Sequence, residues 1–471
     1  MIRFFYEQEL IELDHSAPDL TVLDWLRLVK RRTGTKEGCG SGDCGACTVV
    51  TVSVMNGVAG QPRLRYESIN SCITFVGALH GKQLLTVESL ADDHTLHPVQ
   101  QAMVDEHGSQ CGFCTPGFVM SMYALYQQHE PEDDLRDQID QALGGNLCRC
   151  TGYRPIKSAA MKALDWRAER GQPAIDDQAL INRLTALLAS DVNINGFHQP
   201  ASLESFAQLY EQNPTMRLLA GGTDLALEVT QQMKTLAQII HVGRVPELRI
   251  IEVNEDHILL GAAVTLSECL ALMSENIPAA RDMLLRFGSD QVRNQATIGG
   301  NIGSASPIGD LPPLLIALNA KLTLQRGNTL RTLNLQDYYT GYRQTCLQAG
   351  EFIRHVELPM PLQNSIVAVH KISKRTDDDI SSVCLAVHLP QSSGKTTEAR
   401  LAFGGMAATP VRAMLAERAL NNRIFDEQAV LAASEQLAIE LHPISDARAS
   451  AECRLKVAQN LLQRVLLEAG T

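Results

Sequence analysis

The pattern of apolar and polar residues changes in character along the chain. Residues 1–82 contain short apolar runs, and the pair Met1–Glu7 and Leu10–Leu13 predicts a β-hairpin. Thr21 and Asp24 have the spacing of a helix cap, so an amphipathic helix is expected from there to about Gly34. This part of the chain is therefore predicted to be a small β-rich domain.

Residues 83–167 have apolar residues at helical spacing. Thr115-Pro116 favours a helix start, and Gly144-Gly145 favours a helix end. The pattern predicts a domain of four helices, over Pro98–His107, Pro116–His129, Glu132–Leu143 and Pro155–Arg167.

The rest of the chain mixes both patterns, which predicts an α+β multidomain protein. Residues 168–196 are expected to form a linker: Glu169–Asp177 is polar and broken by Gly and Pro, and a short helix is expected over Gln178–Ser190. Residues 197–345 are predicted to form one domain and residues 346–471 a smaller one. The strands expected in the smaller domain are Phe352–Leu358, Val367–Ile372 and Val383–Leu389.

Composition narrows the class of protein. The chain has 471 residues, of which 45% are hydrophobic and 20% charged, enough for several cores. A net charge of −12 gives no electrostatic footprint for nucleic acid or an anionic membrane. The N-terminus lacks the features of a signal peptide and no apolar run approaches membrane-spanning length, so a cytoplasmic location is expected.

Eight of the twelve cysteines stand at ligand spacing. The first motif, a C-x4-C-x2-C run with a distant fourth cysteine, has the plant-type [2Fe–2S] pattern. The second motif consists of a C-x2-C pair followed later in the chain by a C-x-C pair. A zinc site remains the alternative for either set. The first set is Cys39, Cys44, Cys47 and Cys72; the second is Cys111, Cys114, Cys148 and Cys150. The isolated Cys269, Cys346, Cys384 and Cys453 are interpreted as core or incidental residues.

Glycines surround both cysteine sets. Four of them lie in Gly38–Cys47, where they let backbone N–H groups approach the sulfurs. The same stretch satisfies G-x-G-x-x-G, but it neither follows a clear strand nor opens a helix, so a dinucleotide fold is rejected there. Cys148 and Cys150 need a tight turn to share a site, which the flanking Gly144, Gly145 and Gly152 can supply.

Two further glycine-rich segments suggest a cofactor site. Arg217–Leu225 places an apolar strand before a Gly-Gly turn whose N–H groups suit a pyrophosphate. By itself it reads as an ordinary strand-to-helix turn. Gln295–Asp310 is dense in small residues and hydroxyls that permit close approach to a flat cofactor.

Three motifs closely resemble the iron–sulfur region of the molybdenum hydroxylases: Gly38–Cys47, Gln110–Gly117 and Asn146–Pro155. The resemblance implies that the first four cysteines hold the cluster nearer the flavin, in a β-grasp ferredoxin-like domain. The second four would hold the cluster nearer the molybdopterin, in the helical domain. Gln110 would hydrogen-bond the molybdenum cofactor of a catalytic domain; without the resemblance it reads as an exposed loop residue.

The two glycine-rich segments resemble the FAD-binding domain of the same family, and residues 346–471 resemble its C-terminal flavoprotein domain. The first segment would hold the pyrophosphate, with Thr223 and the Gly221 and Gly222 amides as donors. Phe287 would lie against the isoalloxazine. Without the resemblance, Phe287 would be interpreted as an aromatic core residue and Ile353 as an aliphatic core residue. The implied FAD contacts are Leu218, Leu219, Ala220, Gly221, Gly222, Thr223, Asp224, Leu225, Phe287, Thr297, Gly300, Asn301, Asp310, Ile353 and Lys371.

The resemblance also implies the function. The family's full-length members continue into a molybdopterin domain that this sequence does not contain, so no catalytic residue for substrate is expected here and a molybdopterin-binding large subunit is the expected partner. The chain resembles the small subunit of bacterial xanthine dehydrogenase, active in an α2β2 heterotetramer with NAD as electron acceptor. Lys374–Ile380 would be the loop that influences NAD use, with Tyr342 and Arg343 near the nicotinamide. The alternatives are another molybdenum hydroxylase, acting on an aldehyde or N-heterocycle, and a zinc-stabilised non-enzymatic scaffold.

Overall fold

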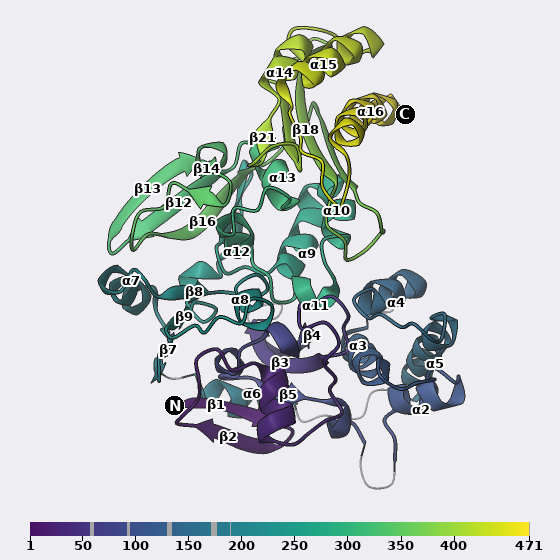
Figure 1. Cartoon of the computed structure of the whole chain (residues 1–471), viewed down its shortest axis with the longest axis vertical. Coiled ribbons are helices and arrows are strands. Elements are labelled where there is room, and N and C mark those ends of the chain that lie inside the picture. Colours follow the sequence, from purple (N-terminus) through teal and green to yellow (C-terminus); the bar gives the residue numbers. More distant parts are fainter. Residues whose placement is uncertain (57–60, 92–94, 130–133, 171–176, 189, 471) are drawn as a thin grey trace. The chain divides into compact units, whose positions relative to one another are not determined.

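The computed structural model describes residues 1–56, 61–91, 95–129, 134–170, 177–188 and 190–470 (Figure 1). These residues form two compact units. Unit 1 contains residues 1–206, 216–245 and 288–296, and unit 2 contains residues 207–215, 246–287 and 297–471. Most of the polar stretch predicted over 169–177, and the first two residues of the helix predicted over 132–143, lie outside the described residues.

Unit 1 begins with a mixed five-stranded sheet in the order β2-β1-β5-β3-β4. The predicted hairpin is confirmed, with Phe5 opposite Leu10. β1 also pairs in parallel with β5, and β3 pairs antiparallel with both β4 and β5. The strands are β1 (Ile2–Tyr6), β2 (Glu9–Leu13), β3 (Thr48–Asn56), β4 (Pro62–Asn70) and β5 (Gln83–Leu85).

The first helix of unit 1 packs on this sheet through Trp25. The Trp25 ring lies edge-on to Phe4 at 5.2 Å and to Tyr6 at 5.7 Å between centroids. The predicted cap is present, because the Asp24 N–H donates to Thr21 Oγ1 at 3.0 Å. The helix, α1 (Val22–Asp24) followed by a π-helical stretch (Trp25–Val29), ends before the predicted Gly34. Leu28 and Val29 are already 64% and 60% exposed, and Arg31 has a φ of 58°, so no apolar face remains to extend the helix.

The four predicted helices form the next part of unit 1. They are α2 (Pro98–Asp105), α3 (Thr115–Gln128), α4 (Leu135–Leu143) and α5 (Arg154–Arg170). α3 is buried along nearly its whole length, because it packs against α2, α4 and α5 and also against β3 and β4 (Figure 1). One hydrophobic core therefore joins the helices to the sheet.

A small four-stranded sheet completes unit 1, in the order β6-β7-β9-β8. Its strands are β6 (Val192–Ile194), β7 (Phe197–Gln199), β8 (Arg217–Leu219) and β9 (Ile239–His241), with β9 parallel to β7 and β8. α6 (Asp177–Ala186) precedes it and forms most of the helix predicted over 178–190. α8 (Ala226–Thr230) and α11 (Asp290–Arg293) also belong to this unit, and α7 (Leu203–Gln212) spans residues of both units.

Unit 2 contains an antiparallel sheet in the order β10-β11-β16-β12-β13 and a hairpin. β16, which lies after the predicted boundary at residue 345, pairs with β11 and β12. The strands are β10 (Ile251–Val253), β11 (His257–Gly261), β12 (Lys321–Arg326), β13 (Thr329–Asn334), β14 (Tyr339–Gly341), β15 (Gln344–Thr345) and β16 (Phe352–Pro359). The accompanying helices are α9 (Leu266–Asn276), α10 (Arg281–Leu285), α12 (Ile298–Gly303) and α13 (Leu311–Ala317).

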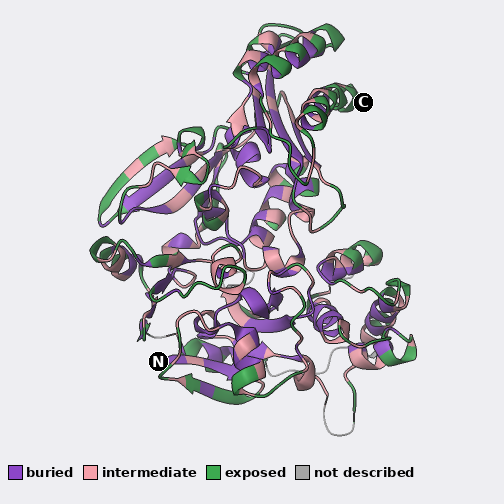
Figure 2. Cartoon of the chain, viewed as in Figure 1, coloured by how far each residue is buried: buried purple, intermediate pink, exposed green. Residues whose placement is uncertain are grey.

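A second antiparallel sheet of unit 2 follows the order β17-β18-β20-β21, with β19 paired to β18. Its strands are largely buried, whereas the outer faces of the C-terminal helices are exposed (Figure 2). The elements are β17 (Ser365–Ile372), β18 (Val383–Ser392), β19 (Lys395–Thr396), β20 (Arg400–Gly404), β21 (Val411–Arg412), α14 (Met414–Leu420), α15 (Glu427–Glu440) and α16 (Ala451–Ala469). The α+β multidomain class predicted from the sequence is confirmed.

Candidate cluster and flavin sites

The β3–β4 hairpin brings the last two cysteines of the first set together. Cys47 directly precedes β3, and Cys72 follows β4 by two residues. Because Thr48 pairs with Asn70, the two thiols meet, with 3.2 Å between the sulfur atoms, and both are buried. Asn70, also buried, accepts from Cys47 Sγ at 3.6 Å and donates to the Gly42 carbonyl at 2.8 Å.

The other two cysteines of the first set lie in the glycine-rich loop before β3. The backbone N–H groups of Ser41 and Cys44 both donate to Cys39 Sγ at 3.4 Å. A hydrogen bond with Cys44 lowers the pKa of Cys39 to about 4, and one with Cys72 lowers the pKa of Cys47. The same hydrogen bonds raise the pKa values of Cys44 and Cys72, so one thiol of each pair favours thiolate, the form that binds metal. A Cβ added at Gly38 would lie 2.7 Å from Cys44 Sγ, so glycine is required there.

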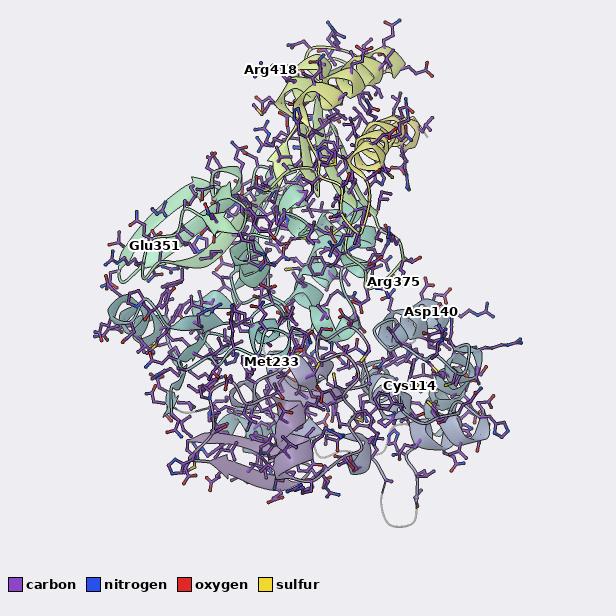
Figure 3. The ribbon with its side chains drawn as sticks, in the orientation of Figure 1. Cys114, Asp140, Met233, Glu351, Arg375 and Arg418 are labelled. Atoms are coloured by element: carbon purple, nitrogen blue, oxygen red, sulfur yellow. The ribbon has the colours of Figure 1, made fainter. Side chains whose placement is uncertain are left out.

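The second set lies at two helix starts. Cys114 (labelled in Figure 3) is the N-cap residue of α3, and Cys148 and Cys150 lie in the turn before α5. Thr151 donates to Cys148 Sγ from its backbone N–H at 3.4 Å and from Oγ1 at 3.1 Å. Cys148 is partly buried, which raises its pKa, but hydrogen bonds with Thr151, Cys150 and Cys114 together outweigh this and the pKa is lowered.

Within the second set the thiols again pair. Burial and then a hydrogen bond with Cys148 raise the pKa of Cys114 to about 12, and a hydrogen bond with Cys111 raises the pKa of Cys150. Cys111 and Cys150 are exposed, unlike the buried Cys47. Gln110, beside Cys111, is also exposed.

The pairing of the cysteines bears on which metal they could hold. In the described ranges, no group of three or more His, Cys, Asp or Glu side chains is arranged around a single metal position. Two pairs in each set instead match two irons that each take two thiolates. The residues therefore fit two [2Fe–2S] clusters.

The first flavin segment lies in unit 1, where it connects β8 to α8. Leu219 is buried in the hydrophobic core, so its side chain holds the turn rather than facing a ligand. Gly222 has a φ of 80°, which glycine adopts readily, and its carbonyl accepts from Ala226 N at 2.8 Å. Gln231, after α8, donates to the carbonyls of Cys39 at 3.1 Å and Gly40 at 3.0 Å. The turn is thereby fixed against the first cysteine loop.

The other predicted flavin residues, Phe287 to Lys371, lie in unit 2. Thr297 caps α12 by accepting from the Gly300 N–H at 3.0 Å. Asp310 and Lys371 are both buried and form an ion pair at 2.6 Å. Neither Asp310 Oδ1 nor Asn301 Oδ1 has a hydrogen-bond partner among the described residues, although both atoms are buried. These two orphaned acceptors fit a ligand that supplies hydroxyl or ring N–H donors, as a flavin does.

The remaining two side chains of this group differ in burial. Ile353 is buried on β16, as its interpretation as a core residue also requires. Phe287 is only half-buried, which argues against a plain core aromatic.

The charged loop predicted to influence NAD use begins just after β17. Arg286 donates to the Lys371 carbonyl at 3.0 Å, the Thr376 carbonyl at 2.9 Å and Ser373 Oγ at 3.2 Å. Arg375 (Figure 3) pairs with Asp379 within the loop. Tyr342 and Arg343 are exposed in the hairpin between β14 and β15.

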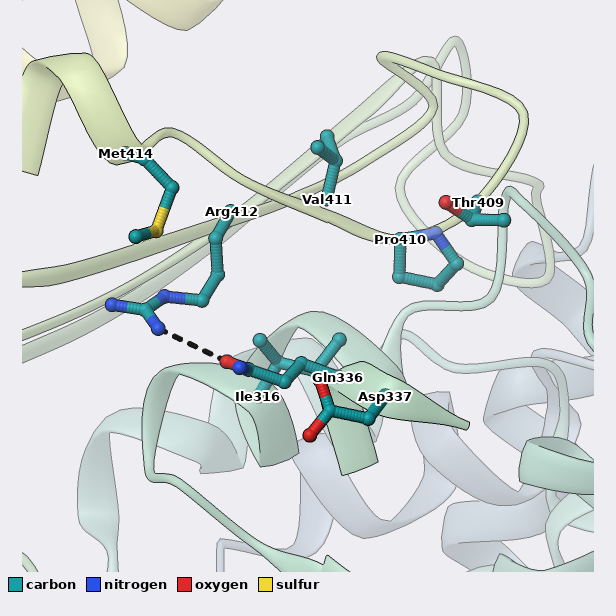
Figure 4. Close-up of a pocket in the computed structure, with 8 residues that line it drawn as sticks. All are labelled: Ile316, Gln336, Asp337, Thr409, Pro410, Val411, Arg412 and Met414. Atoms are coloured by element: carbon teal, nitrogen blue, oxygen red, sulfur yellow. Dashed lines mark hydrogen bonds between the residues drawn. The ribbon is translucent and has the colours of Figure 1, made fainter. Parts of the chain in front are cut away.

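A pocket of about 290 Å³ lies elsewhere in unit 2 (Figure 4). Gln336 in its wall accepts from Arg412 at 3.0 Å and from Arg400 at 3.2 Å. None of the predicted site residues lines it. It therefore adds nothing to the cysteine and flavin sites.

Sequence reasoning missed several residues that support the cysteines. Asn70 and Thr151 contact sulfurs of the two cysteine sets, and Asn146 donates to the Gly45 carbonyl at 2.9 Å. Polar residues within two positions of a cysteine of either set were the available signal. Of the four isolated cysteines, Cys269 and Cys384 are core residues, Cys346 is partly buried and Cys453 is exposed.

One expected result concerns Thr151. Thr151→Val removes the hydroxyl donor to Cys148 Sγ, which stabilises negative charge on a reduced cluster. The potential of the second cluster should fall by about 40 mV, equivalent to roughly 1 kcal/mol for one electron. An EPR-monitored redox titration measures it. Thr115→Val is the matched control, since Thr115 Oγ1 donates to Ser109 and not to sulfur, and an equal shift there would contradict the assignment.

Comparison with family models matches four regions of the chain in order. Residues 5–77 match a 2Fe-2S iron-sulfur cluster binding domain, and residues 86–161 match a [2Fe-2S] binding domain. Residues 191–361 match the FAD binding domain in molybdopterin dehydrogenase, and residues 368–469 match the CO dehydrogenase flavoprotein C-terminal domain.

Curated relatives cover nearly the whole chain. It is 34% identical over 499 residues to xanthine dehydrogenase of Drosophila pseudoobscura pseudoobscura, covering 93% of the chain and 37% of that protein. It is 31% identical over 497 residues to xanthine dehydrogenase/oxidase of Rattus norvegicus, covering 94% of the chain and 37% of that protein. The chain thus spans little more than a third of the length of these relatives.

Solved structures resemble about half of the chain. A carbon monoxide dehydrogenase from Hydrogenophaga pseudoflava has a TM-score of 0.54 and 28% identity, over 57% of this chain and 94% of that one. Quinoline 2-oxidoreductase from Pseudomonas putida 86 has a TM-score of 0.54 and 26% identity, over 59% of this chain and 97% of that one.

Among the described residues, none of the helices combines the length and the apolar character that a membrane span requires.

Proposed function

Because the chain belongs to the molybdenum hydroxylase family, we propose that it is the electron-transfer subunit of a xanthine dehydrogenase. It would carry electrons from a molybdopterin-binding partner subunit through two [2Fe–2S] clusters to FAD and then NAD, during oxidation of hypoxanthine and xanthine to urate. The observation that carries the proposal is the combination, in one chain, of both cluster-domain matches and the flavin-domain match with xanthine dehydrogenases as relatives. A cytoplasmic location would keep the thiols reduced.

The cysteines have the clearest proposed roles. Cys39, Cys44, Cys47 and Cys72 would hold one cluster, and Cys111, Cys114, Cys148 and Cys150 the other. When bound, the clusters and flavin supply the one-electron and two-electron chemistry, while the chain supplies position and potential. Backbone N–H donors at Cys39 and the Thr151 hydroxyl at Cys148 place positive dipoles beside the sulfurs.

The flavin residues are proposed by unit. In unit 1, residues 218–225 would hold the pyrophosphate through Thr223 and the amides of the Gly-Gly turn. In unit 2, Asn301 and Asp310 would each accept a hydrogen bond from the cofactor with their orphaned oxygens. Lys371 would pair with the buried Asp310 carboxylate and hold it in position. The further proposed contacts in unit 2 are Phe287, Thr297, Gly300 and Ile353.

The surface around the second cysteine set supports a partner there. Cys111 and Cys150 are exposed, and Gln110 stands beside them. Three large apolar side chains within three positions of these cysteines in sequence, Phe113, Leu147 and Tyr153, are 48%, 44% and 38% exposed. Exposed apolar groups of this kind are typical of protein interfaces. We therefore place the molybdopterin-binding large subunit on this face, in an α2β2 heterotetramer with Gln110 directed to its cofactor.

NAD use gives a further expected result. Arg286→Ala removes three hydrogen bonds that fix the start of the 374–380 loop. Losing charge-assisted bonds worth about 1.5–3 kcal/mol each should raise the KM for NAD by roughly tenfold or more while FAD stays bound. Steady-state kinetics of the complex with NAD measure this. Arg281→Ala, on the same helix α10, is the control, and an unchanged KM in Arg286→Ala would show that this loop does not contribute to NAD binding.

A second molybdenum hydroxylase activity is favoured by the similarity to quinoline 2-oxidoreductase. That candidate would oxidise an N-heterocycle or an aldehyde with the same electron-transfer chain. The deciding experiment reconstitutes the chain with its large subunit and compares hypoxanthine, xanthine, quinoline and an aldehyde, with NAD or oxygen as acceptor. Xanthine-dependent NADH formation is the expected result. Turnover of quinoline or aldehyde alone would contradict xanthine as the substrate. Oxygen consumption without NADH formation would contradict NAD as the electron acceptor.

A further inference from the structure

The two cysteine loops touch directly within unit 1. The Leu147 N–H, beside Cys148, donates to the Cys44 carbonyl at 3.0 Å. One residue earlier, Asn146 Nδ2 donates to the Gly45 carbonyl at 2.9 Å. A Cβ added at Gly117, at the start of α3, would run into the Gly45 carbonyl oxygen. The loops therefore meet through one backbone hydrogen bond and one hydrogen bond from the Asn146 side chain.

A buried polar network surrounds this contact. Ser121 Oγ on α3 donates to Asn146 Oδ1 at 2.6 Å, and Gln291 Nε2 donates to the same oxygen and to Ser121 Oγ, both at 3.0 Å. Thr48 Oγ1, at the start of β3, accepts from Asn146 at 3.2 Å and from Gln291 at 3.4 Å. Asn146 is 2% exposed and Gln291 is fully buried. Four residues from four separate segments thus share one set of hydrogen bonds.

Gln291 comes from a segment distant in sequence but firmly held. α11 is followed by Asn294, which donates to the Ser68 carbonyl on β4 at 3.0 Å, and by Gln295, which donates to Thr74 Oγ1 at 2.6 Å. Gly145 lacks a side chain where one would clash with Gln291 Oε1. The α11 segment is therefore held by contacts outside the Cys148 loop, and the Gln291 amide reaches from it to Asn146 of that loop.

We propose that Gln291 is a positioning residue for electron transfer between the two clusters. Its amide fixes Asn146, and Asn146 holds the Cys148 loop against the Cys44 loop. Buried networks of this kind are cooperative, so loss of one member loosens the others. The rate of electron transfer between redox centres falls steeply with their separation. The hydrogen bonds of Gln291 and Asn146 would therefore keep the two clusters at a fixed distance. The role in electron transfer rests on the proposed function, because it requires the two proposed cluster sites. The contact between the loops does not require bound metal.

The first test uses Gln291→Met, which keeps side-chain length and removes the hydrogen bonds. Gln83→Met is the matched control, since Gln83 is also buried and donates to the Glu7 carbonyl, away from both cysteine loops. Backbone hydrogen exchange is followed at Leu147. Exchange there should accelerate roughly tenfold or more in Gln291→Met and stay unchanged in Gln83→Met. Unchanged exchange at Leu147 in Gln291→Met, with or without bound clusters, would show that Gln291 does not hold the two loops together.

The second test is the EPR spectrum of the fully reduced holoprotein. The magnetic interaction between the two reduced clusters depends on their separation and orientation. Gln291→Met should broaden or lose the resolved splitting while iron content and both potentials stay as in the parent chain. Ser121→Ala, which removes one donor to Asn146, should give a smaller loss and provides a milder variant if Gln291→Met is poorly folded. A parent-like splitting in both variants would overturn the positioning role, whereas a parent chain without two clusters would instead refute the proposed ligand sets.

Discussion

Cys47→Ser is expected to lower the iron content of the purified chain from about four atoms to about two, because one of two [2Fe–2S] clusters is lost. Cys47 and Cys72 are buried with their sulfurs 3.2 Å apart, so removing one thiol breaks the pair that would hold one iron. The second set lies in a different loop and should keep its cluster. Iron and acid-labile sulfide analysis with EPR measures the change.

Two further cysteine variants serve as controls for Cys47→Ser. Cys150→Ser should cause the mirror-image loss, of the second cluster only. Cys453→Ser should change nothing, because Cys453 is exposed on α16 and belongs to neither set. Equal iron in Cys47→Ser and the parent chain, or zinc in place of iron, would contradict the ligand assignment.

Lys371→Met is expected to give the largest loss of stability and of flavin. It leaves the Asp310 carboxylate buried without its partner at 2.6 Å, and breaking one side of a buried ion pair costs about 3–5 kcal/mol of unfolding free energy. Because Asp310 is also a proposed flavin contact, FAD content should fall. Denaturant unfolding and flavin absorbance of the purified variant measure the two effects.

The double variant Asp310→Asn, Lys371→Met separates charge from packing. Removing both charges should restore much of the stability but not the flavin, since the carboxylate acceptor is gone. Lys321→Met is the control: Lys321 pairs with Glu357 at 3.2 Å on an exposed sheet face, and its loss should cost less than about 1 kcal/mol. Full flavin occupancy in Lys371→Met would argue against this pair as part of the flavin site.

The sequence predicted those parts of the fold and site that depend on local pattern. The short apolar stretches Met1–Glu7 and Leu10–Leu13 predicted the hairpin, and helical spacing predicted α2 to α5 to within a few residues. The cysteine spacing alone predicted two four-cysteine sets. The structure adds the reason why the distant fourth cysteine joins the first set, since the β3–β4 pairing brings Cys72 back to Cys47.

The contacts that the sequence did not predict join residues far apart in the chain. Gln291 and Asn146 are 145 positions apart, and Asp310 and Lys371 are 61 apart. No local periodicity reports such pairs, because they arise only when separate segments pack together. The early end of the first helix was also missed: apolar Leu28 and Val29 fit the pattern, but the fold leaves them exposed.

We propose that one chain carries two [2Fe–2S] clusters and one FAD that exchange electrons with NADH. The ultraviolet–visible spectrum of the anaerobically purified chain tests this, with iron, acid-labile sulfide and flavin quantified before NADH is added. We expect about four irons, about four sulfides and about one FAD per chain, with bleaching on NADH addition. A colourless chain containing zinc would refute the proposed clusters and flavin, and loaded cofactors that NADH leaves oxidised would refute NAD as the electron acceptor.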